Sequence, residues 1–187
     1  MQKITGCPKK MLRLEIKQAL LSVDDFSLME KSKNICLHLR TFLESDLFRE
    51  HFKSLIIGAY APMRDEVDWT SLEKSFSWAY PGFFENEMVF KKCQRSDLVL
   101  SKDFGVNLET PPHTSSDSLP HVLIIPGVAF TKSGGRLGRG KGFYDRYLEK
   151  FPGIKIGLCF NEQLRESIPL ENHDIAMDYV VSENGVF

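Results

Sequence analysis

The segment of this sequence with the clearest chemical character is residues 134–142, GGRLGRGKG, which contains five glycines and three cations. Glycines let successive main-chain N–H groups converge on an anion, and an arginine can bind a phosphate through two donors at once. The whole chain has a formal net charge of only −1, so this local excess of positive charge needs its own explanation. The segment therefore predicts an anion site, and a polyphosphate fits it best. Its cations are Arg136, Arg139 and Lys141.

The elements around this segment predict where the site lies in the fold. The nearly all-apolar run HVLIIPGVAF at residues 121–130 is typical of a strand covered on both faces, and a helix is expected over residues 143–151. In open α/β sheets, ligands bind beyond the carboxyl ends of the strands, where the start of the next helix adds partial positive charge. The alternative is a flexible surface loop with incidental cations.

Two common phosphate-binding motifs fail on spacing. The interval from Gly135 to Lys141 satisfies GxxxxGK, but Gly142 stands where a P-loop needs Ser or Thr for magnesium. The dinucleotide fingerprint GxGxxG fails because Phe143 occupies the place of its third glycine. A small-molecule kinase with a degenerate phosphate loop remains an alternative, with Gly142 against it.

Two carboxylates are candidates for magnesium, Asp145 and Asp174. Asp145 falls in the first turn of the expected helix, where a carboxylate also stabilises the helix dipole, and Asp174 is a common type of turn residue. Sequence alone does not bring the two together.

The pattern of the remaining chain predicts one α/β domain over residues 1–187, with a mainly parallel sheet and helices on both faces. Helices are expected over residues 8–23, after a capping box at residues 27–30, and over residues 70–79. Residues 101–120 have no periodicity and are expected to form a surface loop. Further strands are expected at residues 55–60, 88–90, 154–160 and 178–187.

Composition limits the classes of protein. With 42% hydrophobic and 26% charged residues in 187, the chain has the composition of a soluble globular protein. The near balance of charge argues against a general nucleic-acid binder, and the lack of a long apolar run argues against a signal peptide or membrane span. We therefore expect a cytoplasmic monomer with no nucleic-acid or membrane partner. The four cysteines are far apart and are expected to be reduced, mostly buried thiols rather than zinc ligands.

GGRLGRGKGFYDRYL, taken with VLIIPGVAF before it, closely resembles the signature of the 5-formyltetrahydrofolate cyclo-ligase family. Other stretches agree in order: residues 9–13 with a K-x-x-LR segment, residues 60–68 with an M-x-x-E-[VI]-[DE] stretch, and residues 160–178 with the C-terminal pattern. The resemblance runs from about residue 9 to 186 and is weakest between residues 80 and 120. It implies a fold similar to that of NagB, RpiA and CoA transferases.

The resemblance also implies a reaction, in which ATP and Mg²⁺ convert 5-formyltetrahydrofolate to 5,10-methenyltetrahydrofolate with release of ADP and phosphate. Phosphorylation of the formyl oxygen would turn a poor leaving group into a good one, giving an iminium phosphate that the neighbouring amine attacks. The expected partner is this folate, and its polyglutamylated form is an expected partner too.

The roles of individual residues follow from the resemblance. Lys141 and Arg139 are expected to stabilise transferring charge, and Asp145 and Asp174 to bind magnesium. The expected nucleotide-binding residues are Lys9, Arg13, Arg136, Leu137, Gly138, Arg139, Gly140, Lys141, Gly142, Phe143 and Tyr144. The expected folate-binding residues are Met63, Asp68, Arg139, Gly140, Lys141, Gly142 and Phe143.

Each role has a structural alternative. Lys9 and Arg13 could be solvated cations on one helix face, Met63 could be a core residue, and Asp68 could cap a helix that begins at Trp69. A non-catalytic relative that binds folate or nucleic acid through the basic patch also remains open. So does a paralogue from thiamine metabolism, although the presence of Met63 and Asp68 argues against it.

Overall fold

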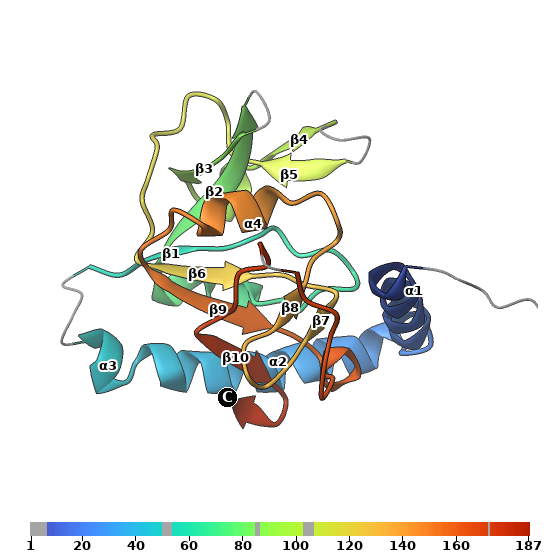
Figure 1. The fold of residues 1–187 in the computed structure, drawn as a ribbon. Coiled ribbons are helices and arrows are strands. Elements are labelled where there is room, and N and C mark those ends of the chain that lie inside the picture. The colour runs from blue at the N-terminus through green and yellow to red at the C-terminus, as the bar shows by residue number, and fades with distance from the viewer. Residues whose placement is uncertain (1–6, 50–53, 85–86, 103–106, 172) are drawn as a thin grey trace, which may run out of the picture.

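The computed structural model describes residues 7–49, 54–84, 87–102, 107–171 and 173–187. Its centre is a seven-stranded sheet of order β11-β10-β9-β6-β1-β2-β3 (Figure 1). The strands from β10 to β2 in this order are all parallel, whereas the edge strands β3 and β11 are antiparallel to their neighbours. The predicted α/β class is therefore confirmed. The strands are β1 (Ile56–Gly58), β2 (Ser77–Phe84), β3 (Glu87–Lys92), β6 (Val122–Ile125), β9 (Ile154–Leu158), β10 (Tyr179–Ser182) and β11 (Gly185–Val186).

Helices cover both faces of this sheet. Side chains of α1 and α2 share one core cluster with Val122 and Ile124 of β6, whereas Leu123 and Ile125 pack in a second cluster with Leu148 of α4. Successive residues of β6 thus point into two different cores, and all four are buried. The prediction of a strand covered on both faces is confirmed. The helices are α1 (Pro8–Leu21), α2 (Asp25–Leu43), α3 (Asp46–Arg49) and α4 (Phe143–Leu148), with 3-10 turns η1 (Thr70–Ser75), η2 (Arg95–Asp97) and η4 (Asn161–Gln163).

Two short hairpins stand outside the main sheet. One pairs β4 (Val99–Ser101) with β5 (Leu108–Thr110), beside the β2–β3 end of the sheet in Figure 1. β5 lies inside the stretch predicted to be a loop, so that prediction is wrong for these residues: three residues are too few for periodicity to reveal a strand. The other hairpin pairs β7 (Ala129–Phe130) with β8 (Arg136–Leu137) and carries the start of the glycine-rich segment.

The helix predicted over residues 70–79 is wrong. A single 3-10 stretch, η1, ends at Ser75, and β2 begins at Ser77 and pairs in parallel with β1. The indole of Trp78 stacks on Trp69 at 4.1 Å between ring centroids, and Tyr80 is fully buried. Aromatic residues favour strands because they pack well on a pleated surface, and here this packing overrides the local helical pattern.

The ends of two other predicted elements also differ. The helix expected after residues 27–30 exists, but Asp24 is its N-cap, since the Asp24 carboxylate accepts a hydrogen bond from the Ser27 main-chain N–H at 2.9 Å. The prediction of a capping box at residues 27–30 is therefore wrong, although the prediction of the helix is confirmed. The single strand expected at the C-terminus is in fact the β10–β11 hairpin, which turns at residues 183–184 and enters β11 at Gly185 with a positive φ of 116°.

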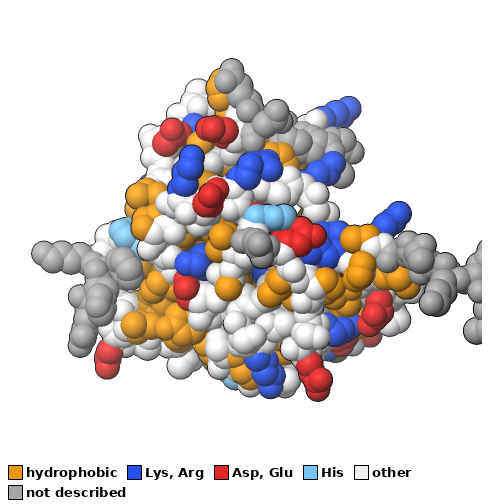
Figure 2. All heavy atoms as spheres, viewed as in Figure 1, with side chains coloured by type: hydrophobic (Ala, Val, Ile, Leu, Met, Phe, Trp, Pro, Cys, Tyr) orange, Lys and Arg blue, Asp and Glu red, His pale blue; other side chains and the backbone are white. Residues whose placement is uncertain are grey.

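The surface agrees with the balanced composition. Basic and acidic side chains are interspersed over the face drawn in Figure 2. Within the described ranges, no helix combines the length and apolar character that crossing a membrane requires. All four cysteines are free thiols, of which Cys36 and Cys159 are buried.

Candidate nucleotide and folate site

The glycine-rich segment was expected to run directly from strand to helix. In the structure it first turns through the β7–β8 hairpin. At the tip of this hairpin, Gly134 has a φ of 91°, and its carbonyl oxygen accepts a hydrogen bond from the Met177 N–H at 2.8 Å. A Cβ at Gly134 would lie only 2.3 Å from the Met177 carbonyl oxygen. Glycine here allows the hairpin to contact the C-terminal part of the chain, which carries Asp174.

The second half of the segment is a loop that leads from β8 into α4. Gly140 and Gly142 have φ values of 92° and 69°, and Gly142 is the N-cap of α4. Arg13 of α1 donates from Nε to the Gly138 carbonyl oxygen at 2.8 Å, and its guanidinium carbon lies 3.4 Å from where a Cβ of Gly140 would be. The N-terminal helix therefore lies directly against this loop, as the predicted role of Arg13 requires.

The loop forms one wall of a cavity of about 270 Å³. The walls are largely apolar, and the ring of Phe83 packs edge to face against Phe143 with centroids 5.1 Å apart. An apolar cavity with a few polar groups at its rim suits a flat ring system. The lining residues are Met63, Phe83, Leu108, Pro126, Arg136 and residues 138–145.

Arg136 is buried at one end of this cavity and is held from two directions. It donates from Nε to the Pro126 carbonyl oxygen at 3.0 Å and forms an ion pair with Asp145 at 2.9 Å. Burial lowers the pKa of Arg136, while Asp145 and, at longer range, Asp174 oppose that shift. Asp145 therefore contacts this guanidinium directly, whereas the described ion pair of Asp174 is with Lys9.

Arg139 forms a second group of ion pairs. Its Nη2 lies 2.8 Å from Asp65 and 2.9 Å from Glu66, and its Nε donates to Glu66 at 3.2 Å. Glu66 is buried, and its other carboxylate oxygen accepts the Met63 N–H at 3.0 Å. Burial raises the pKa of Glu66, although Arg139 acts against this shift.

Lys9 and Asp174 form a third pair, at 2.7 Å, which joins α1 to the C-terminal segment. The pKa of Asp174 is lowered overall: burial alone would raise it, but hydrogen bonds from Lys9 and from the Glu171 N–H outweigh that effect. The pKa of Lys9 is raised, because Asp174 and Glu171 outweigh its partial burial. Two residues 165 positions apart are thus in contact, Lys9 predicted to bind the nucleotide and Asp174 predicted to bind magnesium.

The other predicted residues fall into two groups. Lys141 is exposed at the cavity, and Met63 also lines it, in positions that suit their predicted roles. Leu137 has a buried side chain in the core, so only its main chain could face a nucleotide. Asp68 does not line this cavity, and its carboxylate accepts hydrogen bonds from the Thr70 N–H and hydroxyl at 3.0 and 2.6 Å. Asp68 is not the N-cap expected of it, because η1 begins at Thr70 and its N-cap is Trp69. Asp68 instead lines a neighbouring hollow with Met63.

Among the described residues, no group of three or more His, Cys, Asp or Glu side chains could hold a metal ion by itself. Mg²⁺ in nucleotide sites is usually held by one or two carboxylates together with phosphate oxygens and waters. Asp145 and Asp174 supply a donor set of that kind, although each is paired with a cation here. The residues therefore fit Mg²⁺ bound with a nucleotide.

Sequence reasoning missed one residue of the site, Glu66, and did not foresee the surroundings of another, Tyr144. Glu66 is the glutamate of the M-x-x-E-[VI]-[DE] stretch and could have been singled out on that ground. Tyr144 was predicted to bind the nucleotide as the last residue of the loop. Its hydroxyl is buried in the cavity wall and has no hydrogen-bond partner among the described residues, which makes it an available donor for a ligand.

Comparisons with known proteins identify the family. The model of the 5-formyltetrahydrofolate cyclo-ligase family matches residues 8–183. The 5-formyltetrahydrofolate cyclo-ligase of Saccharomyces cerevisiae is 38% identical over 204 residues, covering 95% of this chain and 96% of the yeast protein. The enzyme of that name from Mus musculus is 39% identical over 197 residues, covering 94% of each chain.

Solved structures agree with these sequence relatives. The NMR structure of a 5,10-methenyltetrahydrofolate synthetase from Aquifex aeolicus superimposes with a TM-score of 0.79 at 26% identity, covering 96% of this chain and 92% of that one. The matching family signature, the full-length relatives and the shared fold lead to one conclusion. This chain belongs to the 5-formyltetrahydrofolate cyclo-ligase family.

Proposed function

We propose that this protein is an ATP-dependent cyclo-ligase that converts 5-formyltetrahydrofolate to 5,10-methenyltetrahydrofolate, with release of ADP and phosphate. The observation that carries the proposal is that the loop at residues 138–145, with its own cations, lines an apolar cavity while Arg13 of α1 is hydrogen-bonded to the same loop. One loop can therefore contact a flat folate ring and a polyphosphate at the same time.

The proposed reaction has two steps. The formyl oxygen attacks the terminal phosphorus of ATP and ADP leaves, which gives an iminium phosphate at the formyl carbon. The neighbouring amine then attacks that carbon, loses its proton, and expels inorganic phosphate to close the ring. Both steps depend mainly on positioning and on stabilising charge on the phosphoryl oxygens.

The residues of this chain divide these tasks. Lys141, exposed at the cavity, would bind the transferring phosphoryl group, and Arg139 would stabilise charge on the same group from beside Glu66. The buried hydroxyl of Tyr144 and the carboxylate of Glu66 would hydrogen-bond polar atoms of the folate. Phe83 and Phe143 would exclude water from the reacting atoms.

Mg²⁺ would be held by Asp145 and Asp174 together with phosphate oxygens, and when bound it neutralises charge on the triphosphate. For these carboxylates to bind it, the pairs with Arg136 and Lys9 must loosen when the nucleotide enters. We expect Asp145→Asn and Asp174→Asn each to reduce the gain in ATP affinity that Mg²⁺ provides, measured by calorimetry without folate.

The proposal is tested with purified protein, 5-formyltetrahydrofolate, ATP and MgCl₂, following the absorbance of the methenyl product and the formation of ADP. Product that requires both ATP and Mg²⁺ supports it. ADP without methenyl product would favour a kinase acting on another acceptor, and ATP or folate binding without turnover would favour a non-catalytic relative. A monomeric state, a cytoplasmic location and acceptance of polyglutamylated folate remain predictions.

A further inference from the structure

Glu66 is a buried carboxylate that joins two stretches of the candidate site. Its side chain is only 4% exposed. One carboxylate oxygen, Oε1, accepts hydrogen bonds from both Nε and Nη2 of Arg139, at 3.2 and 2.9 Å. The other oxygen, Oε2, accepts the main-chain N–H of Met63 at 3.0 Å. A single carboxylate therefore connects the stretch that contributes Met63 to the apolar cavity with the arginine of the glycine-rich loop.

Arg139 needs such a partner, because its own main chain does not hold its side chain in place. It stands between Gly138 and Gly140, and Gly140 has a φ of 92°. The Arg139 side chain is 43% exposed, and an arginine side chain must give up many rotamers to stay in one position. Bonds from Nε and Nη2 to one buried carboxylate fix both the place and the plane of the guanidinium. Within the described part of the chain, Nη1 has no hydrogen-bond partner, so it stays available for a ligand.

Asp65, the preceding residue, contacts the same arginine but is a weaker anchor. Its carboxylate lies 2.8 Å from Nη2 of Arg139, and its side chain is 34% exposed. Water and salt screen an ion pair that lies at the surface, whereas a hydrogen bond to a buried charge is stronger and keeps its geometry. Asp65 and Glu66 therefore form a matched pair, with the same partner and the same charge but different burial.

We propose that Glu66 is a positioning residue, which holds the guanidinium of Arg139 in place for the transferring phosphoryl group. This inference rests on the proposed function, in which Arg139 stabilises charge on that group. A misplacement of about 1 Å at such a group can lower a rate about 10²-fold. A direct contact of Glu66 with folate is a separate role. Initial-rate kinetics distinguish the two roles, because positioning of Arg139 acts on kcat and binding of folate acts on KM.

The first test compares Glu66→Gln with Asp65→Asn in cyclisation assays. Both variants remove one negative charge beside Arg139 and keep nearly the same shape. A glutamine amide has one acceptor oxygen, so it cannot accept the bonds from Arg139 and from the Met63 N–H through two different oxygens. We expect Glu66→Gln to lower kcat about 30-fold, with the KM for 5-formyltetrahydrofolate within about threefold of wild type. Asp65→Asn should change kcat by less than about threefold. Equal losses of kcat in the two variants, or a rise in KM alone for Glu66→Gln, would overturn the proposal.

The second test needs no turnover. Binding of ATP is measured by calorimetry, without folate, for the wild-type protein, Glu66→Gln, Arg139→Ala and the double variant. If Glu66 acts through Arg139, Glu66→Gln should raise the Kd for ATP about fivefold in the wild-type background and less than about twofold once Arg139 is alanine. An effect of equal size in both backgrounds would show that Glu66 acts independently of Arg139 and would refute the positioning role.

Melting temperatures show whether each variant is folded. If Glu66→Gln does not fold, Glu66→Asp takes its place: the shorter carboxylate keeps the charge but cannot reach both partners, so the same dependence on Arg139 is expected. Failure of the proposed function would show itself separately, as absence of methenyl product from the wild-type protein. In that case the calorimetric comparison still tests whether Glu66 acts through Arg139.

Discussion

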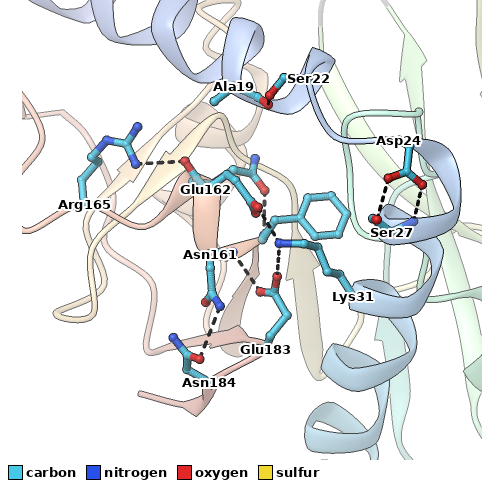
Figure 3. Close-up of polar contacts among 12 residues, drawn as sticks. Ala19, Ser22, Asp24, Ser27, Lys31, Asn161, Glu162, Arg165, Glu183 and Asn184 are labelled. Carbon is cyan, nitrogen blue, oxygen red and sulfur yellow. Dashed lines mark hydrogen bonds and ion pairs between the residues drawn. The ribbon is translucent and has the colours of Figure 1, made fainter.

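Two polar clusters of this molecule contain similar side chains in different surroundings. In the first, which we call the α2 cluster, Lys31 reaches from α2 to the carboxylates of Glu162 and Glu183 (Figure 3). The second oxygen of Glu183 accepts the Asn161 N–H at 2.8 Å, so the cluster fastens the helix to η4 and to the β10–β11 turn. In the other, which we call the loop cluster, Arg136 pairs with Asp145 and Arg139 with Glu66 at the edge of an apolar cavity.

The difference shows that charge pairing alone does not identify a functional site. Both clusters satisfy their cations with carboxylates. The loop cluster differs in its surroundings. Glycines with positive φ lie next to it, where the main chain can approach a ligand closely, and a cavity lies beside its charged side chains. We therefore expect charge removal to affect stability at the α2 cluster and ligand binding or turnover at the loop cluster.

The largest effect is expected from Lys141→Ala. Lys141 is exposed and makes no ion pair among the described residues, so the fold should lose little, with a melting temperature close to wild type. Loss of a charged donor to a transferring phosphoryl group typically lowers the rate about 10²–10³-fold, and we expect that loss in kcat for cyclisation. Lys150→Ala, at an exposed lysine beyond the end of α4, is the control and should keep its activity. Similar rates in the two variants would refute the role of Lys141.

For Lys31→Met we expect the opposite outcome, a loss of stability with little loss of activity. Removing the cation leaves Glu162 and Glu183 close together without compensation, and because Lys31 is partly exposed we expect a loss of about 2 kcal/mol in unfolding free energy. Activity of the folded fraction should stay within about threefold of wild type. Urea unfolding and cyclisation assays on the same preparation give both numbers. The double variant Lys31→Met/Glu183→Gln should recover part of the stability, and a large loss of kcat with unchanged stability would remove the distinction between the clusters.

Alanine substitutions at two glycines distinguish the effect of backbone strain on stability from an effect on ATP binding. Gly140 and Gly185 both have positive φ, so alanine at either position should cost about 1 kcal/mol of unfolding free energy. A Cβ at Gly185 meets no atom within 4 Å, whereas one at Gly140 lies 3.4 Å from the Arg13 guanidinium. We therefore expect Gly140→Ala alone to raise the KM for ATP, by about tenfold, in initial-rate measurements. An equal rise in Gly185→Ala would mean that general loosening explains the effect.

The sequence was informative where one local signal decided the outcome. The all-apolar run at residues 121–130 predicts β6 and its two buried faces, and the glycine-rich motif indicates the loop that lines the cavity. Prediction from the sequence failed where tertiary packing decides the secondary structure. Trp78 and Tyr80 form a strand because they pack against Trp69 and the core. It also could not show that Arg139 meets Glu66, because a pairing across 73 residues depends on the finished fold.

The smallest effect on unfolding free energy is expected at the Lys9–Asp174 pair. This pair sharpens the comparison of the two clusters, because it belongs to the candidate site yet has the geometry of a stabilising ion pair. The lowered pKa of Asp174 means that its contribution to stability is present above its unfolded pKa of about 3.9 and is lost as pH falls through the folded value. Lys9→Met should therefore be less stable than wild type at pH 7, by no more than about 1 kcal/mol for a pair close to the surface. That difference should shrink in urea unfolding as pH is lowered below about 4, with Lys10→Met as the control.

A difference that persists unchanged at pH 3 would show that Lys9 acts through packing rather than charge. If instead Lys9→Met raises the Kd for MgATP more than tenfold at pH 7, the main value of the pair is to hold both side chains ready for the nucleotide.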